Sequence, residues 1–551
     1  MTGKRYRLLF LLLILILLPG CHMPHNRPPT FIPPPAYATP TSGPGPTPRP
    51  TDPPPASATS SPAPTNTAAP TLTGTPPPTE TPPATATVPP TSPPPPTATP
   101  QPTQSVNEDP ILYRAQAGDT LSVVATHFGV KKSDIESEEP LPQESFINPG
   151  QLLIIPRVLF NTTSAEHLLP DSEFVFSPAI VQSADFPDDV ETYVNQAGGY
   201  LSRYRDYLTT TEISGGEIVA RIAQDNSINP YLLLALLEYQ SGWVFGQPNN
   251  LRQMKYPMGH VNYKEDGLVN QLRWAVNQLS IGYYGWREGR LTEVHLVGPD
   301  KPHQDITARI NPQLNAGTAA LQYYFSQVYE SDEWIQALDP NNGFPATYQD
   351  MFGDPTIRAE RFEPLFPHDL TQPELALPFR VGSTWTYTGG PHGAWEREGS
   401  MSAIDFAPTG FDGGCSKSYS YVTASMPGRV LRAEDGVVII DGNDDGFEQT
   451  GWVLLYLHIA EAGRVEAGTY VQTGDKLGHP SCEGGTATGT HVHMARKFNG
   501  EWMTANGPIP FTLSGWTVHS GEKPYKGKLT KGNQTVVASP YSAPGSEITH
   551  R

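Results

Sequence analysis

The chain has 551 residues, more than a single domain usually contains, and its formal net charge is −19. So acidic a chain lacks the basic face that nucleic-acid binding requires, and it has no general electrostatic attraction for anionic polymers. We therefore expect several domains, each recognising its partner through specific contacts.

Residues 1–20 have the pattern of a secretion signal. A basic N-terminal region precedes an apolar core, Leu8 to Leu18, which is too short for a comfortable membrane span. The core ends in Leu18-Pro19-Gly20-Cys21, which resembles a bacterial lipobox although Pro19 is not the usual small residue. We expect an exported lipoprotein, anchored to a membrane of the bacterial cell envelope through a lipid on Cys21. The alternative is ordinary signal cleavage beside an incidental cysteine.

Residues 21–108 are dominated by proline, threonine, serine and alanine, with almost no large apolar side chains. Such a composition cannot bury a core, so it predicts a disordered linker that is partly polyproline II. Fully extended, the linker would reach on the order of 250 Å, at about 3.1 Å per residue. It could carry the folded domains away from an anchor, or it could be a neutral spacer with no required length.

Order is expected to begin in residues 111–156. The string Y-R-A-Q-A-G-D-T-L-S-V-V-A-T-H-F-G-V predicts a strand, a turn at Gly118-Asp119 and a helix capped by Asp119 or Thr120. The string F-I-N-P-G-Q-L-L-I-I-P predicts a turn at Asn148-Pro149-Gly150 and a second strand. Together they resemble a LysM module, a small α+β fold. The resemblance implies binding of glycan that contains N-acetylglucosamine, and the alternative is a structural remnant of the module.

Residues 165–372 predict a mainly α-helical domain. The run I-V-A-R-I-A-Q-D-N-S-I-N-P-Y-L-L-L-A-L-L-E-Y-Q-S-G-W favours a helix, a turn at Asn229-Pro230 and a second, buried helix. Two further sets of apolar residues follow helical spacing. They are Leu268, Leu272, Ala275, Val276 and Leu279, then Leu314, Leu321, Tyr324 and Val328.

The string L-L-A-L-L-E-Y-Q-S-G-W in this domain faintly resembles the catalytic helix of lytic transglycosylases. In that family a glutamate directly precedes the serine, whereas Gln240 precedes Ser241 here. A glutamine cannot protonate a glycosidic oxygen, and Glu238 would point elsewhere on a helix. We therefore expect a degenerate, substrate-holding or packing domain with no glycan-cleaving activity.

Five chemically active residues follow within one β-rich region. His392 lies in G-P-H-G-A-W, Asp405 in S-A-I-D-F-A, His458 in L-Y-L-H, and His491 and His493 in G-T-H-V-H-M. Residues two apart on a strand face the same side, so one histidine of the last pair can bind a metal while its neighbour handles protons. An ionised carboxylate in an apolar strand needs a partner such as zinc. An isolated His-x-His is usually incidental, but the whole set indicates a metallopeptidase.

The region from Leu377 to about Val537 resembles the β-lytic and lysostaphin-type (LytM-like) zinc metallopeptidases. The shared strings are L-P-F-R-V-G-S-T-W-T-Y-T-G-G-P-H-G-A-W, S-A-I-D-F-A, T-A-S-M-P-G-R-V, G-T-Y-V-Q-T-G-D-K-L-G and T-A-T-G-T-H-V-H-M. The long interval between His392 and Asp405 is typical of the β-lytic branch. The resemblance implies a mostly antiparallel β domain over residues 377–537.

By the same resemblance, His392, Asp405 and His493 are the Zn²⁺ ligands, and His458 and His491 are the catalytic residues. It implies a hydrolase that cuts peptide bonds in peptidoglycan cross-bridges or stem peptides. Some members of the family have lost ligands and only activate other wall enzymes. The alternative is therefore a non-catalytic protein that binds peptidoglycan or activates other wall hydrolases.

Cys415 and Cys482 both lie in this region, and an exported protein occupies a compartment that permits disulfides. A bridge between them would close a loop of 67 residues and stabilise the fold by about 4 kcal/mol on the chain-entropy model. Thiolate zinc ligands and free thiols are the alternatives. The last residues, 538–551, are expected to form a flexible tail.

Overall fold

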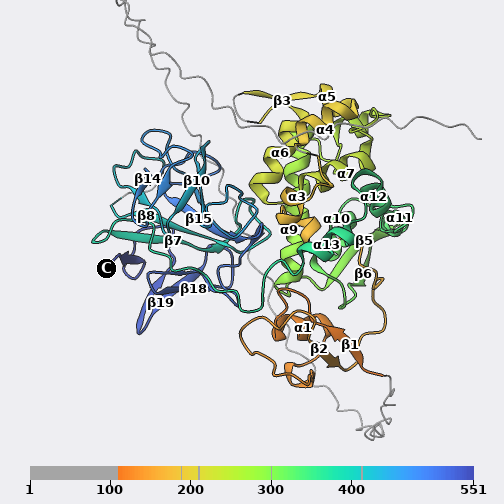
Figure 1. Cartoon of the computed structure of the whole chain (residues 1–551), viewed down its shortest axis with the longest axis horizontal. Coiled ribbons are helices and arrows are strands. Elements are labelled where there is room, and N and C mark those ends of the chain that lie inside the picture. Colours follow the sequence, from red (N-terminus) through yellow and green to blue (C-terminus); the bar gives the residue numbers. More distant parts are fainter. Residues whose placement is uncertain (1–108, 188, 209–210, 299–300, 411–413) are drawn as a thin grey trace, which may run out of the picture. The chain divides into compact units, whose positions relative to one another are not determined.

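The computed structural model describes residues 109–551 apart from 188, 209–210, 299–300 and 411–413 (Figure 1). The predicted signal, the lipidation site Cys21 and the linker lie outside the described residues. The described residues all belong to one compact unit. Within the described part of the chain, no helix is both long and apolar enough to cross a membrane.

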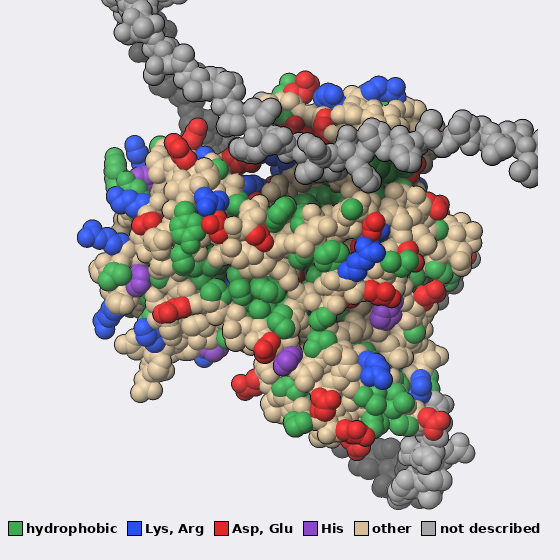
Figure 2. All heavy atoms as spheres, in the orientation of Figure 1, with side chains coloured by type: hydrophobic (Ala, Val, Ile, Leu, Met, Phe, Trp, Pro, Cys, Tyr) green, Lys and Arg blue, Asp and Glu red, His purple; other side chains and the backbone are tan. Residues whose placement is uncertain are grey.

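The N-terminal segment, residues 111–156, contains two antiparallel strands and a short helix. Its elements are β1 (Ile111–Arg114), α1 (Leu121–Phe128), the 3-10 helix η1 (Lys132–Asp134) and β2 (Leu152–Ile155), and β1 pairs with β2. Thr120 caps α1, because its side chain accepts a hydrogen bond from the Val123 amide. Asp119 instead closes the preceding turn by accepting from the Gln116 amide and the Tyr113 hydroxyl. Acidic side chains gather over this segment (Figure 2), and glycan binding by it stays a prediction.

The helical domain, residues 165–372, contains twelve described helices and two hairpins that the sequence did not predict. The helices are α2 (Asp171–Phe174), α3 (Pro178–Gln182), α4 (Val190–Ala197), α5 (Tyr200–Arg203), α6 (Gly215–Asn226), α7 (Pro230–Ser241), α8 (Leu251–Lys255), α9 (Leu268–Arg287), α10 (Ala316–Ser326), α11 (Ser331–Ala337), α12 (Phe344–Phe352) and α13 (Pro355–Phe362). The hairpins are β3 (Arg205–Tyr207) with β4 (Glu212–Ser214), and β5 (Glu293–Gly298) with β6 (Lys301–Arg309).

The predicted pair of helices around Asn229-Pro230 is confirmed as α6 and α7. The Asn229 side chain accepts from the Tyr231 amide and caps α7, while Pro230 occupies the first turn, where its missing N–H is not needed. The helix predicted from Leu314 to Val328 is shorter at both ends. Leu314 precedes the cap of α10 and Val328 follows its last turn, although the core buries Leu314.

The β domain consists of antiparallel strands, so the predicted mixture of helices with a β-rich C-terminal region is confirmed. A nine-stranded sheet runs in the order β13-β10-β11-β12-β15-β8-β7-β21, with β16 paired to β15. Two smaller sheets have the orders β14-β9 and β17-β18-β19-β20. The bounds are β7 (Thr384–His392), β8 (Ala403–Pro408), β9 (Val422–Thr423), β10 (Gly428–Glu434), β11 (Val437–Asp441), β12 (Trp452–Leu457), β13 (Tyr470–Val471), β14 (Lys476–Gly478), β15 (Val492–Phe498), β16 (Glu501–Trp502), β17 (Thr512–Leu513), β18 (Trp516–Ser520), β19 (Gly527–Lys531), β20 (Gln534–Val537) and β21 (Glu547–Thr549).

Both faces of the central strands are buried. Val438, Ile440, Leu454 and Tyr456 point into the core of the β domain. The alternate residues Val437, Ile439, Val453 and Leu455 belong to one apolar cluster with the helical domain. Burial on both faces explains why β11 and β12 are continuous apolar runs without the alternation of a half-exposed strand. The two domains therefore share a core.

The expected flexible tail, residues 538–551, adds a strand to the large sheet. β21 pairs with the edge strand β7, and Ile548 in it is only 1% exposed. The short string S-E-I-T-H contains a single apolar residue, which is too weak a pattern to predict a strand. Pairing becomes favourable because β7 offers an unpaired edge and a pocket for that one side chain.

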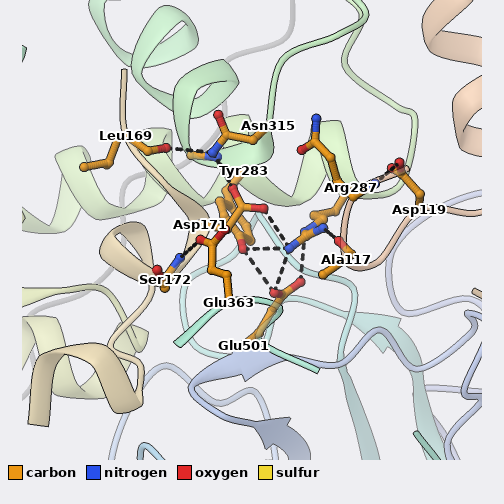
Figure 3. A network of polar contacts seen from close by, with 12 residues as sticks. Ala117, Asp119, Leu169, Asp171, Ser172, Tyr283, Arg287, Asn315, Glu363 and Glu501 are labelled. Carbon is orange, nitrogen blue, oxygen red and sulfur yellow. Dashed lines mark hydrogen bonds and ion pairs between the residues drawn. The ribbon is translucent and has the colours of Figure 1, made fainter. Parts of the chain in front are cut away.

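Arg287, at the end of α9, joins the three parts of the described chain (Figure 3). It forms ion pairs with Asp171 at 3.0 Å and with Glu501 of the β domain at 3.1 Å. It also donates to the carbonyl of Ala117 in the N-terminal segment. Burial raises the pKa of Glu501, although Arg287 opposes that shift. The guanidinium is thus the cation on which these buried carboxylates depend.

We predict that Arg287→Gln lowers the free energy of unfolding by about 3–5 kcal/mol, because it leaves the Glu501 and Asp171 carboxylates buried without a cation. Urea unfolding of the purified chain at neutral pH measures the loss. Arg361→Gln, on the exposed side of α13, is the control and should change stability by about 0.5 kcal/mol or less. Equal stabilities for the two variants would contradict the role given to Arg287.

Candidate metal centre

Three neighbouring strands bring the predicted ligands together. Asp405 lies on β8 and His493 on β15, where the two residues are direct partners in the ladder. His392 is the last residue of β7, on the other side of β8. The register of β7 against β8 shifts between Tyr387 and Gly389 and again between Gly389 and His392. Such bulges re-aim a side chain, and here they turn His392 toward Asp405.

The ligand atoms of these residues meet at one buried point. His392 Nε2 and His493 Nδ1 each lie 3.3 Å from Asp405 Oδ1, and they are 3.0 Å from each other. Burial alone would raise the pKa of Asp405, but His392 and His491 hold it well below its usual range. The carboxylate is therefore ionised beside two imidazoles.

The hydrogen bonds on the far side of each ring decide which nitrogen faces this point. His392 Nδ1 donates to the Gly390 carbonyl at 2.8 Å, and His493 Nε2 donates to the Ala394 carbonyl at 2.8 Å. In a neutral imidazole the other nitrogen then carries a lone pair. Asp405 Oδ1 is buried with no hydrogen-bond partner among the described residues. With both rings in this neutral form, three electron-pair donors face one another, and such a set fits a metal cation such as zinc.

The other two predicted histidines lie beside this cluster. His491 Nε2 is 3.8 Å from Asp405 Oδ1, and the ring centroids of His458 and His491 are 4.5 Å apart. His458 Nδ1 donates to the Glu483 carbonyl and His491 Nδ1 to the Gly489 carbonyl, both at 2.7 Å. In the neutral form of each ring, Nε2 is therefore the nitrogen with the lone pair. The structure brings all five predicted residues into one site.

Two local expectations differ in detail. His491 lies just before β15 and makes only an isolated bridge with Ser481, although it was expected within the strand. His458 follows the last residue of β12 with φ of 67°, a left-handed conformation that is uncommon for non-glycine residues. Burial and the neighbouring His491 lower the pKa of His458 to about 4, so its imidazole is neutral at neutral pH.

Two residues of the site escaped the sequence analysis. Tyr525 stacks on His392 with ring centroids 4.1 Å apart, yet it lies far along the chain in an unremarkable loop. Gly389 faces Asp405 across the ladder, and a Cβ built on it would lie 2.3 Å from Asp405 Oδ2. The G-G-P-H string was a signal for such a close approach, because glycine is the residue that tolerates it.

The predicted disulfide between Cys415 and Cys482 is formed, with its Cα atoms 5.8 Å apart. It therefore excludes these two sulfurs as thiolate ligands. The bonded loops also hold the two outer histidines. The Ser481 amide donates to the His458 carbonyl at 2.7 Å, and the Thr490 amide donates to the Gly414 carbonyl at 3.1 Å.

The string that resembled a transglycosylase helix has a structural role. Glu238 on α7 accepts hydrogen bonds from the amides of Val244 and Phe245, at 2.9 and 3.0 Å. Gln240 Oε1 accepts from the Tyr329 hydroxyl at 2.7 Å. The carboxylate thus secures the loop that follows the helix.

Comparisons with known proteins agree with this geometry. Residues 167–365 match the family model described as LasA, N-terminal domain. Protease LasA of Pseudomonas aeruginosa strain UCBPP-PA14 is 29% identical over 306 residues, which are 51% of this chain and 65% of LasA. The β-lytic metalloendopeptidase of Lysobacter enzymogenes is 26% identical over 181 residues, which are 31% of this chain and 96% of that protein. These matches support a LasA-like metallopeptidase of the β-lytic type.

The predicted resemblance to the β-lytic branch is therefore confirmed. The chain spans 65% of the length of the LasA relatives that it matches. The similarity of the helical domain to the N-terminal domain of LasA was not predicted from its sequence motifs. Among solved structures, the M23 metalloprotease pseudoalterin is 22% identical with a TM-score of 0.26, over 30% of this chain and 96% of that one.

We predict that Gly389→Ala weakens zinc binding by about 10- to 100-fold, because the new methyl group displaces the Asp405 carboxylate. Competition with a fluorescent zinc chelator measures the affinity. Gly489→Ala is the matched control, since its Cβ would meet its nearest neighbour at 3.4 Å. Unchanged affinity in Gly389→Ala would show that the close approach to Asp405 is not needed.

We predict that His493→Ala abolishes stoichiometric zinc binding, because it removes one of three ligands, whereas His491→Ala retains the metal. Elemental mass spectrometry of the purified variants after dialysis measures the zinc content. Loss of zinc from His491→Ala together with retention by His493→Ala would mean that the two roles are exchanged.

Proposed function

We propose that this protein is a zinc metalloendopeptidase that hydrolyses peptide bonds in peptidoglycan cross-bridges or stem peptides. The observation that carries the proposal is the meeting of the lone pairs of His392 Nε2 and His493 Nδ1 with the Asp405 carboxylate, beside two further histidines. The similarity to proteins named as a protease and as β-lytic metalloendopeptidases supports hydrolysis of peptide bonds.

Different residues of the site would bind the metal and transfer the proton during hydrolysis. A zinc ion held by His392, Asp405 and His493 would supply Lewis-acid polarisation of the scissile carbonyl and activation of water. His491 directs Nε2 toward Asp405 while its Nδ1 donates to the Gly489 carbonyl, so it is placed to take a proton from the attacking water and to return it to the leaving amine. Burial lowers the pKa of His458 to about 4, so its imidazole stays neutral and can accept a hydrogen bond from the attacking water. Once His491 has taken the proton, its imidazolium can donate to the developing oxyanion.

The remaining expectations place this activity at the bacterial cell envelope. We propose export, a lipid on Cys21 that anchors the chain to a membrane, and glycan binding by residues 111–156. Tethering to glycan would raise the local concentration of substrate, so even a weak binding module would increase the rate of cleavage. The N-terminal signal pattern and the LysM-like strings support this arrangement.

We predict that the chain releases peptides with new amino termini from purified peptidoglycan, and that a zinc chelator prevents the release because it removes the Lewis acid. Mass spectrometry of the soluble fragments identifies the bond that is cut. His491→Ala should retain zinc and lose roughly 10²- to 10⁴-fold in rate, the usual contribution of a general base.

Two results would contradict the proposed function. A folded, zinc-loaded protein that cleaves nothing across a panel of wall types would indicate a binding protein or an activator of other hydrolases. Products with new reducing or anhydro-sugar ends would place the chemistry in the helical domain.

A further inference from the structure

The helical domain supplies a second wall to the groove that contains the metal centre. This groove has a volume of about 1590 Å³ and is lined by all five of the predicted site residues. It is also lined by Arg221 and Asp225 of α6 and by Arg273 of α9. A substrate lying over the metal centre would therefore meet side chains of both domains.

This second wall is fixed in place. Apolar residues of the large sheet and of the helical domain form one cluster, and the Trp502 indole donates to the Asn226 carbonyl at 3.1 Å. Arg432 of β10 forms ion pairs with Asp225 at 2.7 Å and with Glu448 at 2.6 Å. Because apolar and ionic contacts both hold the domains together, the wall is part of the site.

Four of the arginines that line the groove differ in whether they are paired, and Arg464 and Lys526 line it as well. Arg221 is neutralised by Glu434 at 3.1 Å and by Asp435 at 3.3 Å, and Arg432 is paired as described. Arg273 and Arg397 are exposed, and neither makes a hydrogen bond or ion pair with another described residue. Guanidinium groups that have no ion-pair partner in this groove are available to bind an anionic ligand.

Arg273, Arg397 and Glu396 line the same groove as the metal centre. Both guanidinium groups act electrostatically on the Glu396 carboxylate. Arg397 also acts on the Tyr525 hydroxyl, and the Tyr525 ring stacks on the ligand His392. Glu396 is a single carboxylate facing two guanidiniums, so this pair of arginines retains donors for a further anion.

We infer that Arg273 of the helical domain and Arg397 of the loop after His392 together bind a free carboxylate of the peptide substrate. The guanidinium group is planar and presents paired N–H donors that match a carboxylate. This inference rests on the proposed function and deepens it, because it selects a peptide with an acidic group near the scissile bond. A neutral glycine bridge would gain nothing from this subsite.

The test uses two synthetic peptides that share the sequence around the cleaved bond, one with a free side-chain carboxylate and one with the corresponding amide. We predict that Arg273→Gln and Arg397→Gln each raise KM for the carboxylate peptide about ten-fold, the effect of losing one charge-assisted hydrogen bond. The kcat for this peptide should change little, and KM for the amide peptide should stay the same. Arg273→Lys should restore part of the lost affinity.

Arg252→Gln, an exposed arginine of α8 outside the groove, is the matched control and should behave as wild type. Thermal unfolding of each full-length variant checks that it is folded. Chelator-sensitive cleavage by the wild type with identical KM values in all variants would overturn the subsite and leave the proposed function standing. Faster cleavage of both peptides by the two variants would show that the wall obstructs the groove, which also overturns the inference. No cleavage by the wild type would reject the proposed function itself.

Discussion

The buried carboxylate of Asp405 is the constraint to which the surrounding structure is adjusted. An ionised group in the interior must be matched by positive charge, and in their neutral form His392 and His493 turn lone pairs toward Asp405. A metal cation at the centre would match the carboxylate and both rings at once. It explains the bulges in β7, the glycine at position 389 and the backbone carbonyls that orient both rings.

The outer histidines depend on a different part of the fold. His458 and His491 lie on loops at the ends of β12 and β15, and these loops are tied together by the Cys415–Cys482 disulfide and by backbone hydrogen bonds. Loops fixed in this way hold the imidazoles of His458 and His491 at constant positions beside the ligand cluster. The proposed metal ligands thus lie on strands, whereas the proposed proton-transfer residues lie on loops.

The helical domain contributes to the stability of the β domain and to the shape of the site. It buries the second face of the central strands, and it lines the groove opposite the metal centre. Arg287 adds the N-terminal segment to the same unit, because its guanidinium contacts carboxylates or carbonyls in all three parts. The helical domain was expected to be degenerate, to hold substrate or to pack. It packs against the β domain, and its position beside the groove makes contact with substrate possible.

Sequence by itself identified the five residues that the structure brings together and the helix pair around Asn229, because each lies in a recognisable local string. It also proposed the disulfide, which the structure selects from the three states that the sequence left open for the two cysteines. Tertiary structure alone decided that Tyr525 stacks on His392, that Ile548 adds a strand to the edge of the sheet, and that Arg273 lines the groove. These contacts join residues that are distant in the chain. They arise from the packing of whole elements, and a single sequence carries no local signal for that packing.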